Sequence, residues 1–247
     1  MKIEIVGFDY GNTLVSDPFE KIMKLKGNDF VKIMEKSGYE ITKKKLIETW
    51  TKINAEINYP FCSHFAQELP LIKELVNVLE IKKNDKIKVA QSLLIAYRSG
   101  LKQILKNDKK MEKVRFVLHE LKKRNKKLFI ISNERVHSLT IQLRWTKLHE
   151  FFDKIIVSEK FGIEKPDLRL FQKVLKYFDT KPEKVAYVGD DPERDIKPAK
   201  AIGIKAILLD QPKEMSCVWR SYNVELKENE KPDFVIKDLS ELLKIIE

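Results

Sequence analysis

The pattern that most limits the possible folds is an alternation of short apolar segments with segments of helical periodicity. It dominates the chain after residue 108, and one further apolar segment lies near the N-terminus. The predicted strands comprise residues 2–8, 127–132, 154–157, 185–189, 204–208 and 233–237. The predicted helices between and after them comprise residues 111–124, 136–148, 167–178, 193–202 and 239–246. Because repeated strand–helix–strand units form parallel sheets covered by helices on both faces, the sequence predicts an α/β fold with a doubly wound, Rossmann-like parallel sheet.

A long segment between the first and second predicted strands has a different character. Residues 17–107 contain long amphipathic segments of helical period and no convincing strand. The simplest assembly inserts this helical segment into the sheet domain as a cap. We therefore expect two domains, a Rossmann-like core of residues 1–16 and 108–247 and a helical cap of residues 17–107.

The charge of the chain is strongly basic, but its distribution argues against a specific nucleic-acid partner. Lys and Arg total 48 against 37 Asp and Glu, a formal net charge of +11. The basic residues are spread in short groups along the whole chain, without interleaved aromatic residues or a recognition-helix pattern. We interpret the excess as a lysine-rich solvated surface that favours small anionic ligands, and we expect no specific nucleic-acid binding.

Short apolar runs, charged residues near the N-terminus and the spacing of the cysteines predict the cellular location. No apolar run approaches the roughly 20 residues that span a bilayer, and the first strand carries Lys2 and Glu4 where a signal peptide is apolar. Cys62 and Cys217 lie far apart and lack the spacing of a metal clip. We therefore expect a cytoplasmic protein with no membrane association.

Polar residues follow several of the predicted strands at the edge where parallel sheets bind ligands. Asp9 ends the first strand, Ser132 and Asn133 end the second, and Asp190 follows Gly189. Each alone could be a turn or a helix cap. Lys165 lies in the loop before the predicted helix 167–178. Together, these residues supply a nucleophilic carboxylate, a hydroxyl, an ammonium and further acids, which phosphoryl transfer with Mg²⁺ requires.

Four segments that carry these residues resemble the motifs of the haloacid dehalogenase superfamily. They comprise residues 8–14 (Phe-Asp-Tyr-Gly-Asn-Thr-Leu), 130–133 (Ile-Ile-Ser-Asn), 162–167 (Gly-Ile-Glu-Lys-Pro-Asp) and 188–196 (Val-Gly-Asp-Asp-Pro-Glu-Arg-Asp-Ile). The resemblance covers the predicted core, and the helical insertion resembles the type 1 cap of that superfamily.

The resemblance implies a role for each residue. Asp9 would be the nucleophile, Ser132 would bind the transferring group, and Lys165 would pair with Asp9 and the substrate. Mg²⁺ would be held by Asp9, the carbonyl of Gly11, and Asp190, with Asp195 steadying its water shell or Lys165. The residues expected beside the substrate are Tyr10, Thr13 and Asn133. Asp191 is equally well interpreted as the cap of the helix that follows it.

Gly11 departs from the phosphatases of that superfamily, which normally carry a second aspartate there as general acid and base. Three functions therefore stay open, in this order of preference. The first is a Mg²⁺-dependent phosphohydrolase for small substrates with good leaving groups, or one with a substitute acid such as His64. The second is a phosphate-binding or weakly active protein. The third is a 2-haloacid dehalogenase, disfavoured because several carboxylates would oppose an anionic substrate without a cation.

Overall fold

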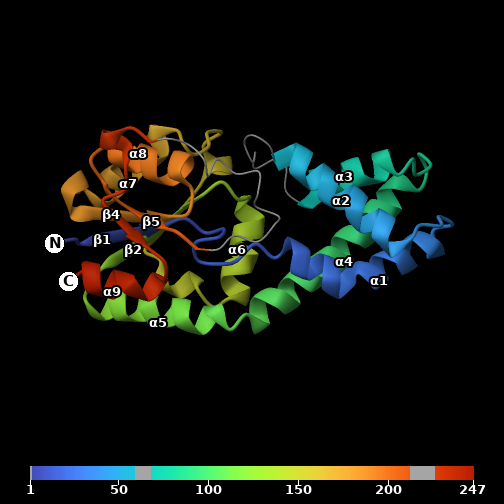
Figure 1. Ribbon diagram of the computed structural model, residues 1–247, viewed down its shortest axis with the longest axis horizontal. Coiled ribbons are helices and arrows are strands. Elements are labelled where there is room, and N and C mark those ends of the chain that lie inside the picture. The colour runs from blue at the N-terminus through green and yellow to red at the C-terminus, as the bar shows by residue number, and fades with distance from the viewer. Residues whose placement is uncertain (1, 59–67, 212–225) are drawn as a thin grey trace. The chain divides into compact units, whose positions relative to one another are not determined.

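The computed structural model describes residues 2–58, 68–211 and 226–247. It divides the chain into two compact units, which are drawn in Figure 1. One unit consists of the described residues up to Ser16 and from Asp108 onward. The other consists of the described residues between Asp17 and Asn107.

The first unit is built on a six-stranded sheet in which every neighbouring pair of strands is parallel. The strands are β1 (Ile5–Phe8), β2 (Lys127–Ser132), β3 (Lys154–Val157), β4 (Val185–Gly189), β5 (Lys205–Leu209) and β6 (Phe234–Ile236). Their order across the sheet is β3-β2-β1-β4-β5-β6. The chain therefore reverses its direction of travel between β1 and β4, which is the switch point where such sheets bind ligands.

Helices cover both faces of this sheet, as the sequence predicts. They are α5 (Lys110–Lys123), α6 (Val136–Trp145), α7 (Leu168–Phe178), α8 (Lys197–Ala201) and α9 (Leu242–Ile245). Figure 1 shows α7 and α8 on one side of the strands and α5 and α9 on the other. On the first side, Phe129 and Tyr187 of the sheet pack with Leu170 and Phe171 of α7 in one buried cluster.

Gly7 allows two aromatic rings from the neighbouring strands to meet over β1, the strand that Asp9 follows. Its neighbours in register are Phe129 on β2 and Tyr187 on β4. The two rings stack with centroids 6.0 Å apart and an interplanar angle of 25°. A Cβ at Gly7 would overlap the ring of Phe129, so the stacking requires a residue without a side chain at this position.

Two aspartates extend the parallel pairing just before β3 and β6. Asp153 accepts from the backbone N–H of Leu128 at 2.8 Å and from the ammonium of Lys122 at 2.9 Å, and its own N–H donates to the Leu128 carbonyl. Asp233 makes the same two backbone hydrogen bonds to Ala206. Ionised carboxylates therefore satisfy backbone donors where the two outer strands begin.

The segment after β4 differs from the predicted continuous helix over residues 193–202. A π-helical turn, Pro192–Ile196, precedes the short helix α8. The N–H of Ile196 donates to the carbonyl of Asp191, five residues earlier. Pro198, the second residue of α8, has no N–H to donate to the preceding turn, so an unbroken α-helical ladder over residues 193–202 cannot form.

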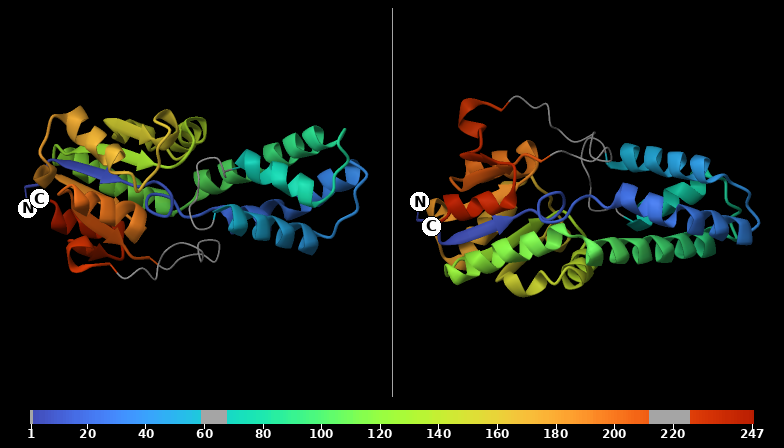
Figure 2. Two further views of the ribbon diagram at one scale, coloured as in Figure 1. Left: turned by 90° about the horizontal axis from the view of Figure 1, so that it is seen from above. Right: turned by 60° about the horizontal axis from the view of Figure 1, so that its bottom comes forward.

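The second unit contains four described helices, namely α1 (Phe19–Lys36), α2 (Lys43–Asn58), α3 (Glu68–Val78) and α4 (Lys86–Asn107). Figure 2 shows them packed along one another, with α4 against both α1 and α3. The fully buried ring of Trp50 lies 4.8 Å from Phe30 and 5.8 Å from Tyr97, centroid to centroid. Across the part of the chain that the structure describes, no helix is both long and apolar enough to cross a membrane.

Candidate active site

Asp9 follows β1 at the switch point of the sheet, in the position that the sequence predicts for a nucleophile. Its N–H donates to the carbonyl of Val188 on β4, which continues the parallel pairing and fixes its backbone. Its Oδ1 accepts from Lys165 Nζ at 2.6 Å, and its Oδ2 lies 3.4 Å from the Thr13 hydroxyl. The carboxylate is therefore held from two sides, and its side chain is only 11% exposed.

Lys165 is the cation of the site and is itself buried. Its Nζ lies 2.6 Å from Asp9 Oδ1 and 2.6 Å from Asp195 Oδ1. Burial by itself lowers the pKa of an ammonium, but the two carboxylates outweigh that effect, so the pKa of Lys165 lies above its usual value. Lys165 is thus held in its charged form.

Asn133 holds the backbone of Lys165 rather than pointing only toward a ligand. Its Oδ1 accepts from the Lys165 N–H at 2.9 Å, and its Nδ2 donates to the Lys165 carbonyl at 3.2 Å. This double hydrogen bond links the end of β2 to the loop before α7. The contacts give Asn133 a role in placing the lysine, which sequence reasoning missed, and its contact with substrate stays a prediction.

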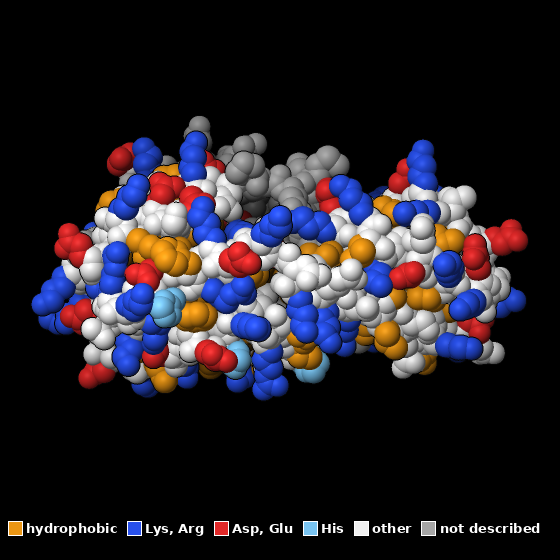
Figure 3. Space-filling view, turned by 90° about the horizontal axis from the view of Figure 1, so that it is seen from below, with side chains coloured by type: hydrophobic (Ala, Val, Ile, Leu, Met, Phe, Trp, Pro, Cys, Tyr) orange, Lys and Arg blue, Asp and Glu red, His pale blue; other side chains and the backbone are white. Residues whose placement is uncertain are grey.

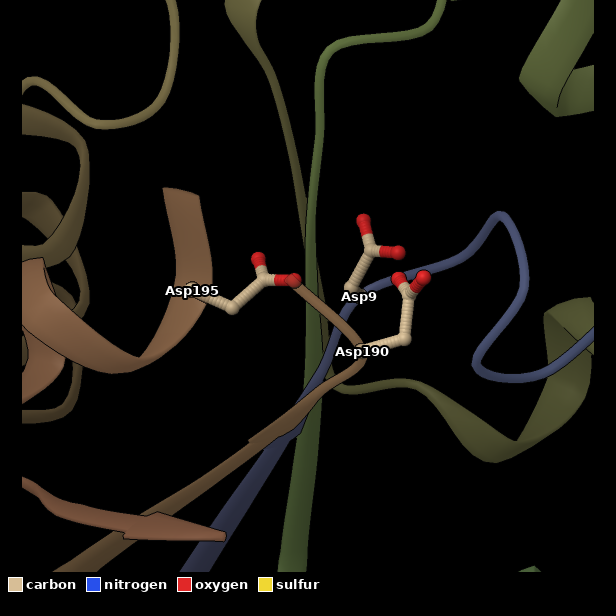
Figure 4. Close-up of side chains that lie close together, drawn as sticks. All are labelled: Asp9, Asp190 and Asp195. Atoms are coloured by element: carbon tan, nitrogen blue, oxygen red, sulfur yellow. The ribbon is translucent and has the colours of Figure 1, made fainter. Parts of the chain in front are cut away.

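Asp190 and Asp195 join this cluster from the end of β4 and from the π-helical turn. Asp195 accepts from Lys165 through Oδ1 and from the N–H of Asp191 through Oδ2, at 3.2 Å. A Cβ at Gly189 would overlap the Asp195 side chain, so this glycine lets Asp195 approach the strand. Figure 4 shows the Asp9 and Asp190 carboxylates side by side, with Asp195 directed toward them from the following turn.

The cluster brings three carboxyl groups close together. One carboxylate oxygen from each of Asp9, Asp190 and Asp195 lies within 4.8 Å of the others. Lys165 contacts Asp9 and Asp195, so one ammonium is shared between two of these three carboxyl groups. Burial raises the pKa of Asp195, Lys165 opposes this rise, and the charges of Asp9 and Asp190 add to it. This oxygen donor set fits a divalent metal ion such as Mg²⁺.

Asp191 has a local structural function that matches its interpretation as a helix cap. Its Oδ1 accepts from the N–H groups of Glu193 and Arg194 at 3.0 and 3.1 Å. Its Oδ2 faces Arg194 Nε at 3.8 Å. Asp191 therefore begins the turn that delivers Asp195.

The remaining predicted residues are buried around these groups. Ser132 is 2% exposed at the end of β2, and its hydroxyl oxygen accepts from the N–H of Glu134 at 3.1 Å. Tyr10 is 1% exposed, and burial followed by the charge of Glu134 raises the pKa of its phenol. Thr13 is fully buried against Asp9. Their roles toward a substrate stay predictions.

Gly11 contributes no side chain to the site and has room for one. A Cβ built on it meets no atom of the described residues within 4 Å, its two chain neighbours aside. The neighbouring Asn12 takes the left-handed conformation with φ of 58°, which asparagine tolerates better than most residues. His64, considered from the sequence as a substitute acid, lies outside the described residues.

Tyr187 is a site residue that sequence reasoning overlooked. Its hydroxyl lies 3.4 Å from both Lys165 Nζ and Asp195 Oδ1, and it donates to the carbonyl of Ile131 at 3.1 Å. The sequence offered one clue, a tyrosine hydroxyl within the otherwise apolar segment 185–189. Tyr187 is two residues from Gly189, so the two positions lie on the same face of the strand.

Comparison with known proteins agrees with this architecture. The sequence pattern of the haloacid dehalogenase-like hydrolase family matches residues 66–209, more than half of the chain. A glyceraldehyde 3-phosphate phosphatase from Methanocaldococcus jannaschii is 29% identical over 244 residues, which span 97% of this chain and 95% of that protein. The chain belongs to the haloacid dehalogenase-like hydrolase family and is a hydrolase of that type.

Solved structures share the fold at lower identity. A HAD phosphatase from Thermococcus onnurineus superposes with a TM-score of 0.65 at 19% identity, covering 98% of this chain and 97% of that one. A 2-haloacid dehalogenase from Pseudomonas syringae pv. Tomato superposes with a TM-score of 0.64, also at 19% identity and with the same coverage. Because both activities occur on this fold, the choice between them depends on the residues of the site.

Proposed function

We propose that this protein is a Mg²⁺-dependent phosphohydrolase for small phosphorylated substrates, with Asp9 as the nucleophile. The observation that carries the proposal is the buried arrangement of Asp9, Lys165 and Asp195, in which one ammonium bridges two carboxylates at 2.6 Å each. Asp190 completes an acidic cluster beside them. The phosphatase relative from M. jannaschii supports the same activity.

The reaction would proceed in two displacements. An Asp9 oxygen attacks phosphorus and forms an aspartyl phosphate, while the bond to the leaving oxygen breaks and that oxygen keeps the electron pair. Water then attacks the aspartyl phosphate, which releases phosphate and restores Asp9. Lys165 orients the Asp9 carboxylate through its 2.6 Å hydrogen bond and opposes the negative charge that develops on the phosphoryl oxygens. Ser132 is proposed to donate its hydroxyl to the same group.

The residues proposed to hold Mg²⁺ are Asp9, Asp190 and the carbonyl of Gly11. Asp195 accepts from Lys165 through one oxygen and from the N–H of Asp191 through the other, and we propose that it steadies Lys165 or the water shell of the metal. When bound, Mg²⁺ neutralises the carboxylates and the phosphate that must approach them. The dehalogenase alternative has less use for several carboxyl groups beside the nucleophile.

The leaving group is proposed to depart without strong assistance from an acid. Gly11 offers no proton donor. The pKa of Lys165 is raised above its usual value, so Lys165 is a poor proton donor to the leaving group. Aryl and acyl phosphates, whose leaving oxygens are weakly basic, therefore suit the described part of the site better than alkyl phosphates. A protein that binds phosphate and turns over slowly is the second candidate, and the missing side chain at Gly11 is what favours it.

The helical unit is proposed to act as a cap that determines which substrate reaches Asp9, with residues 1–16 and 108–247 as the core. We expect small anionic substrates, no specific nucleic acid and a cytoplasmic location. Figure 3 agrees with the charge interpretation, because Lys and Arg side chains are spread among acidic ones over the face shown.

The deciding experiment compares hydrolysis of an aryl phosphate, an acyl phosphate, glyceraldehyde 3-phosphate and a 2-haloacid, with and without Mg²⁺. We expect Mg²⁺-dependent release of phosphate that Asp9→Asn abolishes. The matched control is Asp179→Asn, the same change at an exposed position whose left-handed backbone suits asparagine equally. Halide release without Mg²⁺, or phosphate binding without turnover of any substrate, would contradict the proposal.

A further inference from the structure

We propose that Tyr187 is a positioning residue of this site, whose hydroxyl accepts the third N–H of Lys165 and so holds the ammonium between Asp9 and Asp195. An effect on turnover rests on the proposed function, whereas an effect on the ammonium itself does not. The residue lies in the middle of β4 beneath the site, and its side chain is fully buried.

The hydrogen bonds of Lys165 account for all three of its protons. Within the described residues, Nζ donates to Asp9 Oδ1 and to Asp195 Oδ1, each at 2.6 Å, and to Tyr187 Oη at 3.4 Å. The lysine side chain is only 4% exposed, so water has little access to the third proton. A buried ammonium with an unsatisfied N–H is destabilised, which makes the phenol oxygen a necessary acceptor.

The hydroxyl proton of Tyr187 has its own acceptor, which leaves the oxygen available to Lys165. The carbonyl of Ile131 is 3.1 Å away, nearer than Asp195 Oδ1 at 3.4 Å. Burial, with the charges of Asp195 and Asp9, raises the pKa of the phenol, so it stays protonated. Tyr187 therefore links the backbone of β2 to the ammonium.

Aromatic packing fixes where this hydroxyl lies. The Tyr187 ring stacks against Phe129 across Gly7 and meets Phe171 edge to face, with centroids 5.0 Å apart. The backbone of Lys165 is held separately by Asn133. The lysine is thus fixed at both ends of its flexible side chain. The phenol oxygen itself contacts Lys165, Asp195 and the carbonyl of Ile131 on β2.

Tyr187→Phe tests this assignment because it removes the oxygen and keeps the ring. The control is Tyr177→Phe, which removes a hydroxyl that contacts the Asp153 carbonyl at 3.4 Å on the surface of the same unit. With an aryl phosphate and Mg²⁺, we expect Tyr187→Phe to lower kcat about 10-fold, with KM and the Mg²⁺ activation constant unchanged. Tyr177→Phe should match the parent.

A packing role would give a different result, namely lower stability with an unchanged kcat per folded molecule, and that result would overturn the proposal. Unfolding by urea, measured on both variants, separates the two cases. The kcat-against-KM comparison is informative only if the parent is a phosphohydrolase.

A measurement that does not depend on activity tests the positioning role even if the proposed function is wrong. In ¹⁵N-lysine-labelled protein without metal, the Lys165 ammonium should give a resonance whose protons exchange slowly, identified by its loss in Lys165→Met. Tyr187→Phe should broaden or remove it, whereas Tyr177→Phe should not. Rapid exchange of the Lys165 protons in the parent, or an unaltered signal in Tyr187→Phe, would overturn the positioning role whether or not any substrate is turned over.

Discussion

Replacing Gly11 by aspartate should convert the site from one suited to good leaving groups into one that also cleaves alkyl phosphates. The described part of the chain has room for the change, because a Cβ at Gly11 meets none of its atoms within 4 Å beyond the two chain neighbours, and the φ of Gly11 lies outside the left-handed region. The free energy of unfolding should therefore change by less than about 1 kcal/mol. The substitution tests chemistry rather than folding.

The expected gain follows from the location of the new carboxyl group. It would lie two residues from Asp9, whose carboxyl group clusters with those of Asp190 and Asp195. Neighbouring negative charge raises the pKa of a carboxyl group, which favours the protonated form that an acid catalyst needs. General acid catalysis is worth about 10²- to 10⁴-fold, so kcat/KM for an alkyl phosphate should rise by at least about 10², and that for an aryl phosphate by much less.

The assay measures release of inorganic phosphate from matched alkyl and aryl esters in the parent, in Gly11→Asp and in Gly11→Asn. Asparagine has the shape of aspartate and no acidic proton, so Gly11→Asn should leave the ratio of alkyl to aryl turnover as in the parent. An unchanged ratio in a folded Gly11→Asp protein that still hydrolyses the aryl ester would refute the reasoning. So would an equal gain in Gly11→Asn.

Two further predictions concern stability. Gly7→Ala should lower the free energy of unfolding by about 3 kcal/mol, because its Cβ overlaps the ring of Phe129. Urea unfolding should show no such loss in Gly11→Ala, where the Cβ has no contact with the described residues beyond its chain neighbours. Burial alone raises the pKa of Asp153, but the Leu128 N–H and a lysine ammonium lower it below its unfolded value. Its contribution to stability is therefore present above about pH 4 and is lost as the pH falls through the folded pKa. Asp153→Asn should reduce the acid dependence of unfolding, and an unchanged dependence would contradict this.

Much of the core could be predicted from local pattern. Apolar segments of strand length alternate with amphipathic helices, and that alternation leaves a parallel sheet as the simplest assembly. The ends of β1 and β4 are marked by Asp9 and Asp190, and parallel strands bring their carboxyl ends to one edge. The irregular turn at residues 192–196 was not predicted, because helical periodicity does not distinguish a π-helical turn from an α-helix.

By itself, the sequence determined which chemical groups are available and at which edge of the sheet they gather, since strand period and strand ends are local properties. Only the tertiary structure decided how those groups are held. Tyr187 and Asn133 contact Lys165 from other elements of the chain, and Gly7 matters because rings from two neighbouring strands meet over it. These relations depend on distances between segments remote in sequence, which no local periodicity encodes.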